Sequence, residues 1–120
     1  MPIITVYGLP YDAPTNLPGI VYQLKRDFKN LVAGIQELKL QQDQVSVFFS
    51  GDRDERCQGK VIMISVDGLF YQPERTEEVR MRLAKLIGDR IYDDFPGAHI
   101  ECFVQCFKPS FGYWSSEDAK

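Results

Sequence analysis

The chain contains little of what many catalytic sites and targeting segments are built from. Its 120 residues include one histidine, one tryptophan and three cysteines. There is no phosphate-binding glycine motif, no CxxC, no HExxH and no serine in a nucleophile elbow. The start, Met1-Pro2-Ile3-Ile4-Thr5, lacks the basic residues and apolar core of a signal peptide, and no apolar run approaches the roughly 20 residues that cross a bilayer. We therefore expect a cytoplasmic protein that does not bind membranes.

The composition is that of an ordinary globular domain, with 44% hydrophobic and 26% charged residues. The net charge of -3 argues against a nucleic-acid partner. We expect one domain over residues 1–114 and a tail over 115–120. The cysteines have no metal-type spacing, and Cys102 and Cys106 would lie about 13 Å apart on a shared strand, too far to form a disulfide. We expect no metal and no cofactor, because His99 beside Glu101 is a weak ligand signal.

Hydrophobic periodicity predicts four strands, over residues 2–7, 45–49, 61–66 and 100–107. It also predicts two helices. The first is capped by Asn16 and carries an apolar stripe at helical spacing: Ile20, Leu24, Phe28, Leu31, Ile35 and Leu38. The second is capped by Thr76, with Glu77 and Glu78 in its first turn, and ends at Phe95-Pro96-Gly97.

The order strand-helix-strand, twice, predicts an α+β fold in which two βαβ units form a four-stranded sheet with both helices on one face. The strands at 45–49 and 61–66 are nearly continuous hydrophobic runs, although two helices can cover only one face of the sheet. We expect the other face to be buried against copies of the same chain in a closed ring. The alternative is that loops or the C-terminal segment cover it.

The amino terminus is the remaining candidate for chemistry. Removal of Met1 before the small residue Pro2 would expose a secondary amine. An α-amino group has a pKa of about 7.7–8.0 in water, and apolar surroundings or nearby cations lower the pKa of an amine. A neutral secondary amine can take a proton from a carbon beside a carbonyl and return it elsewhere. Met-Pro is also a common start without function, so both interpretations stay open.

Together with the element order, this start resembles a known family. A chain that opens Met-Pro-Ile-Ile directly into a strand and continues with two βαβ units resembles the tautomerase superfamily, which includes 4-oxalocrotonate tautomerase and macrophage migration inhibitory factor (MIF). The segment His99-Ile100-Glu101-Cys102-Phe103-Val104, followed by Phe111-Gly112-Tyr113-Trp114, is similar to the ending of the MIF-like members. The pattern suggests a bacterial-type branch.

The resemblance implies an isomerase that acts as a homotrimer on a small keto or enol acid, with Pro2 as the general base in a pocket between subunits. It implies that Lys39 helps to bind the substrate acid. His99 and Glu101 take the positions of a tyrosine and an asparagine that the adjacent subunit contributes. The wall of the pocket would be formed by Phe111 and by Tyr113 or Trp114.

The sequence departs from the family pattern at the arginines that bind acids. In the oxalocrotonate branch arginines occupy the positions of Asp12 and Ser46. Arg53, Arg56 or Arg75 would have to supply the missing charge, and solvated loop residues are the alternative for Arg53 and Arg56. Two other functions fit the same element order: a non-catalytic tautomerase-fold oligomer and a ferredoxin-like ligand-binding module.

Overall fold

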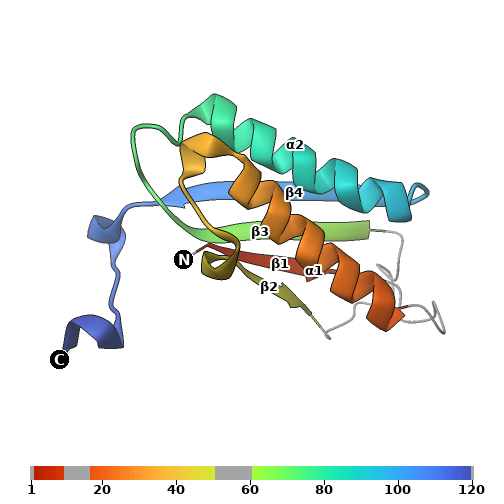
Figure 1. The fold of residues 1–120 in the computed structure, drawn as a ribbon, viewed down its shortest axis with the longest axis horizontal. Coiled ribbons are helices and arrows are strands. Elements are labelled where there is room, and N and C mark those ends of the chain that lie inside the picture. Colours follow the sequence, from red (N-terminus) through yellow and green to blue (C-terminus); the bar gives the residue numbers. More distant parts are fainter. Residues whose placement is uncertain (1, 10–16, 51–60, 120) are drawn as a thin grey trace.

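The computed structural model describes residues 2–9, 17–50 and 61–119 (Figure 1). The regular elements follow the predicted order: β1 (Ile3–Tyr7), α1 (Leu17–Gly34), β2 (Ser46–Phe49), β3 (Val61–Phe70), α2 (Glu77–Asp94) and β4 (His99–Phe107). Two single turns, η1 (Gln36–Leu38) and η2 (Gln42–Gln44), connect α1 to β2. The predicted cap Asn16 and the charged segment 52–60 lie outside the described residues.

The sheet has the strand order β2-β1-β3-β4. β1 is parallel to β2 and β3 is parallel to β4, whereas the central pair β1 and β3 is antiparallel. Each parallel pair is joined by a helix, so the two predicted βαβ units are confirmed. The register places Ile3 opposite Ser46 on one side and Asp67 on the other, which fixes the start of the chain between β2 and the end of β3.

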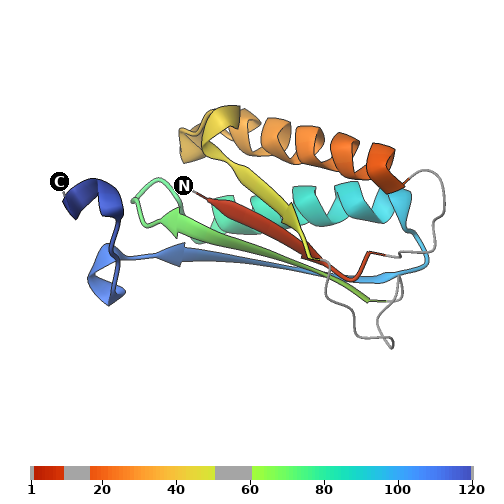
Figure 2. The same cartoon turned by 90° about the horizontal axis from the view of Figure 1, so that it is seen from below.

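Both helices pack on one face of the sheet, as predicted (Figure 2). The hydroxyl of Thr76 accepts a hydrogen bond from the backbone N–H of Val79 at 3.3 Å, which confirms the predicted cap of α2. Most of the core is formed by apolar side chains that recur at helical spacing in the helices and at every second position in the strands: Leu24, Phe28, Val32, Val79, Leu83, Ile87, Ile91, Ile4, Val6, Val47, Ile62, Ile64 and Val66.

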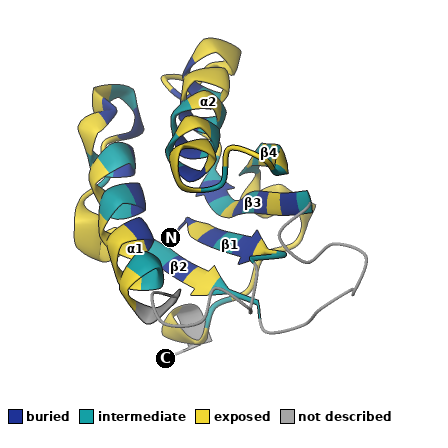
Figure 3. Ribbon diagram, turned by 90° about the vertical axis from the view of Figure 1, so that its right-hand side faces the viewer, coloured by how far each residue is buried: buried dark blue, intermediate teal, exposed yellow. Residues whose placement is uncertain are grey.

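The other face of the sheet is not covered by any described element. Side chains alternate along each strand, so the hydrophobic runs divide into a buried and an exposed set (Figure 3). We call the exposed set the open sheet face: Ile3, Tyr7, Phe48, Met63 and Phe103, which are between 38% and 56% exposed. The C-terminal segment from Lys108 onward continues beyond the end of β4 instead of covering this face (Figures 1 and 2).

Two predicted boundaries are wrong. β3 does not stop at Asp67-Gly68 but continues to Phe70, because a bulge between Val66 and Leu69 takes up the glycine, whose φ is 71°. α1 ends at Gly34 rather than at Leu38. The last two residues of its apolar stripe are nevertheless buried, because the turn η1 returns Leu38 to the core.

Within the described residues neither helix is long and apolar enough to span a membrane.

Candidate functional site

A small cavity of about 210 Å³ lies at the end of the sheet where β1 begins and β3 ends. It is lined by Pro2, Lys39, Leu40, Gln44, Gly68, Phe70, Gln72 and Arg75. Two of these side chains are cationic, and none of the described lining residues is acidic. The cavity thus combines the chain's opening proline with positive charge.

Pro2 is buried, and its backbone is paired with the sheet. Its carbonyl oxygen accepts a hydrogen bond from the backbone N–H of Ser46 at 3.1 Å, which continues the pairing of β1 with β2. The bulge at Gly68 lies on the opposite side. The ring nitrogen is an amide as long as Met1 is attached, and becomes a secondary amine when Met1 is removed.

Lys39 reaches the cavity through an uncommon backbone conformation. It follows the buried Leu38 and caps η1 with a φ of 54°, the one positive φ of a non-glycine residue in the described part of the chain. The left-handed conformation costs an L-residue about 1 kcal/mol, and such strain is frequent at functional sites. The ammonium is solvated and lies 3.8 Å from the carboxylate of Glu74. Such a loose, exposed ion pair leaves the lysine available to an anion.

Arg75 is the buried cation of the site, with a residue exposure of 5%. Its guanidinium donates to the carbonyl oxygens of Phe70 at 2.6 Å and of Leu38 at 2.8 Å. It therefore ties the end of β3 to η1. Its Nε has no hydrogen-bond partner among the described residues. Burial lowers the pKa of Arg75 below its usual value, an effect that Cys106 and Glu74 partly oppose. An arginine remains charged at neutral pH all the same.

Of the three arginines that the sequence left open, Arg75 is described by the structure, and it lines the cavity together with Pro2 and Lys39. Arg53, Arg56 and Asp12 lie outside the described residues. Sequence reasoning missed Gln44, Phe70 and Gln72 as lining residues. The sequence offered one signal for them: each lies near the end of a strand, and the loops at strand ends often carry binding residues.

His99 and Glu101 do not join Pro2 within the protomer. Glu101 pairs with Met63, the partner of Tyr7, and so lies about 13 Å further along the strands than Ile3. His99 Nε2 and Glu101 Oε1 are 3.2 Å apart, on the exposed side of β4. The two side chains share a face, as predicted. His99 and Glu101 could act at the Pro2 cavity only if they came from a second copy of the chain.

The aromatic residues of the C-terminal segment lie nearer to the cavity. The ring of Tyr113 contacts the ring of Phe70 edge-on, with centroids 4.9 Å apart, and Phe70 lines the cavity. Phe111 packs edge-on against Phe107, not against the cavity. Trp114 is 77% exposed. Of the three predicted wall residues, the structure therefore brings Tyr113 next to the site within one protomer.

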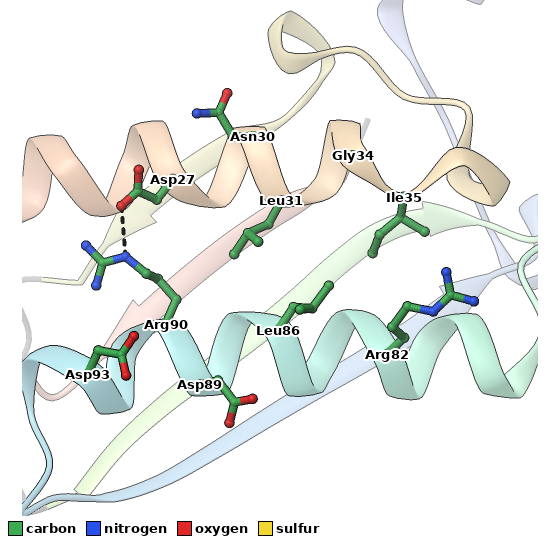
Figure 4. A pocket seen from close by; sticks show the side chains of 10 residues that line it. All are labelled: Asp27, Asn30, Leu31, Gly34, Ile35, Arg82, Leu86, Asp89, Arg90 and Asp93. Carbon is green, nitrogen blue, oxygen red and sulfur yellow. Dashed lines mark hydrogen bonds and ion pairs between the residues drawn. The ribbon is translucent and has the colours of Figure 1, made fainter.

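A larger groove of about 580 Å³ runs between α1 and α2 (Figure 4). Its floor is apolar, formed by Leu31, Ile35 and Leu86. The Arg90 Nε donates to Asp27 at 2.8 Å across the groove, and hydrogen bonding to Arg90 is the main cause that lowers the pKa of Asp27. This ion pair joins the two helices, whereas Asp89 pairs with Lys85 within α2 and Arg82 pairs with Glu37 of η1. The smaller cavity at Pro2 is the better candidate for chemistry.

No family model and no curated protein matches the chain. Solved structures match its fold. The structure of N1, a member of the cis-3-chloroacrylic acid dehalogenase family, superposes with a TM-score of 0.66 and 14% identity over 93% of this chain and 79% of that one. A fused 4-OT described as an asymmetric trimer gives 0.65 and 11%, covering 98% of each chain. MIF of Toxoplasma gondii gives 0.60 and 16%, covering 94% and 96%. The chain has the tautomerase superfamily fold.

Proposed function

We propose that the chain, once Met1 is removed, is a tautomerase that uses the Pro2 nitrogen as a general base on a small keto or enol acid. The observation that carries this proposal is the cavity in which the buried Pro2 meets Arg75 and Lys39 with no described acidic lining residue. Two cations favour an anionic ligand, and they also favour the neutral form of a nearby amine.

The reaction requires only the transfer of a proton. The carboxylate of the substrate is attracted by the charge of the Arg75 guanidinium, which lines the cavity, and is bound by the exposed ammonium of Lys39. The Pro2 nitrogen takes the proton from the carbon or oxygen of the keto or enol group, and the electron pair of the broken bond enters the conjugated system. The same nitrogen then returns the proton to the other end of that system.

A homotrimer would complete the site and bury the open sheet face. The protomer exposes five large apolar side chains on one side of the sheet, an arrangement typical of an interface. The fold neighbour 4-OT is described as a trimer. In such an assembly His99, Glu101, Phe111 and Trp114 of an adjacent copy would approach Pro2, which they do not do within one protomer. Burial of Pro2 in a dry site between copies would strengthen its contacts with charged groups.

Ketonisation of phenylenolpyruvate tests the proposal. The mass of the purified chain first shows whether Met1 is absent. The processed wild type should accelerate the reaction, and Pro2→Ala should lower kcat/KM at least about 100-fold, the usual contribution of a general base. Pro96→Ala, in an exposed turn at the far end of α2, is the matched control and should keep the wild-type rate. A processed wild type that gives no rate above buffer would exclude the tautomerase and leave a non-catalytic oligomer.

A further inference from the structure

The orientation of one amide at the cavity is fixed by the local fold. Gln41 and Gln44 form a capping box around η2, in which each side chain accepts a hydrogen bond from the backbone N–H of the other residue. The N–H of Gln41 donates to Gln44 Oε1 at 2.8 Å. A backbone N–H can donate only to the oxygen of a side-chain amide, so the oxygen of Gln44 is the atom that is used.

The other half of this amide remains unused. The NH2 group of Gln44 can donate hydrogen bonds but cannot accept them, and it has no acceptor among the described residues. Gln44 lines the same cavity as Pro2, Lys39 and Arg75. Of the four polar side chains that line the cavity, Lys39, Arg75 and Gln44 can only donate to a ligand, and two of these three carry a charge, whereas no hydrogen bond to a described residue fixes the amide of Gln72. Charged donors bind a carboxylate more strongly than a neutral amide does. The neutral donor is therefore left for an uncharged oxygen of the ligand.

We propose that Gln44 is a specificity residue whose amide NH2 donates to the keto or enol oxygen of the bound acid, which rests on the proposed function. This bond distinguishes a 2-oxo acid from an acid of the same shape without the oxo group. It also strengthens as charge develops on that oxygen during proton transfer. Because the capping box fixes the amide, the donor is in place before the ligand binds.

The test measures binding of two acids, phenylpyruvate and 3-phenylpropionate, to the processed full-length chain by titration calorimetry. The wild type should bind the oxo acid about 10-fold more tightly, the effect of one neutral hydrogen bond. Gln44→Met is neutral and removes the donor, and Gln44→Glu keeps an oxygen for the Gln41 N–H but replaces the NH2 group by oxygen. Both variants should lose the preference, and Gln44→Glu should also weaken binding of both acids.

Gln41→Glu is the matched control, because it adds the same charge within the same capping box at a residue that does not line the cavity. It should keep the wild-type preference. Thermal unfolding of each variant shows that it is folded. If both Gln44 variants keep the preference while the wild type binds and ketonises its substrate, the role of Gln44 is wrong and the proposed function stands. A wild type that binds neither acid overturns both.

Discussion

Replacing Arg75 by methionine should destabilise the protein far more than the same change at another arginine. The guanidinium of Arg75 donates to the carbonyl oxygen of Phe70, five residues away in the sequence, and to that of Leu38, 37 residues away. A buried acceptor that loses its donor costs about 1–3 kcal/mol. Since some water can replace one donor, we expect a loss of about 3 kcal/mol in the free energy of unfolding.

Arg82→Met is the control, because Arg82 is solvent-exposed and its ion pair with Glu37 at 2.8 Å is on the surface. Its unfolding should stay close to that of the wild type. Urea titrations followed by circular dichroism, at one fixed protein concentration, give both free energies. Arg75→Lys should fall between the wild type and Arg75→Met, because an ammonium keeps the charge but cannot present the same planar fork.

The same variants separate the structural role of Arg75 from its role in the site. A small carboxylic acid that binds the cavity should raise the Tm of the wild type and of Arg82→Met, because a ligand that binds only the folded chain stabilises it. It should not raise the Tm of Arg75→Met. Equal unfolding free energies for Arg75→Met and Arg82→Met would refute the structural reasoning, and an undiminished ligand-induced shift in Arg75→Met would refute the anion site.

Two further predictions concern the sheet. Phe103→Glu places a charge on the open sheet face, where Phe103 is 50% exposed, and should reduce the proposed homotrimer to the 13.8 kDa chain in analytical ultracentrifugation. Tyr22→Glu is the control, because Tyr22 lies on α1 and is 69% exposed, and it should leave the mass unchanged. Equal masses for the wild type, Phe103→Glu and Tyr22→Glu would contradict the interface. Burial raises the pKa of the Cys102 thiol to about 11, so only about one thiol in a thousand is ionised at pH 8. Intact-protein and peptide mass spectrometry should find Cys102 of the folded protein unmodified by iodoacetamide at pH 8. The thiol should react faster as the pH rises or after unfolding. Rapid modification of the folded protein at pH 8 would exclude this burial.

Much of the fold could be predicted from the sequence because it depends on local patterns. Leu24 and Phe28 on α1, and Leu83 and Ile87 on α2, recur at the spacing that puts apolar side chains on one face of a helix. Thr76 had the side chain that a helix start requires. The order of elements then restricted the topology to two βαβ units. The end of β3 escaped prediction, because Gly68 in a strand signals a stop and a bulge equally well.

The candidate site was only half predictable. Pro2 was identified from its chemistry at the terminus, and Lys39 from the resemblance. Neither approach could choose among Arg53, Arg56 and Arg75, since a charged residue in a predicted turn has the same local pattern whether it is solvated or buried. The role of Gln44 depends on which atom of its amide the backbone uses, and this is a property of the folded turn η2.

The sequence by itself determined the order and type of the helices and strands, the apolar faces of the two helices and the presence of a proline whose amine can be exposed, because these follow from residue types and their spacing over a few turns. Only the tertiary structure decided that Arg75 and Lys39 meet at Pro2. Their shared place around one cavity requires β1 to lie between β2 and β3. It also requires the buried guanidinium of Arg75 to donate to two carbonyl oxygens from separate parts of the chain. Desolvation makes a buried cation without such partners unfavourable, so the burial of Arg75 depends on the packing that brings these two carbonyl oxygens together.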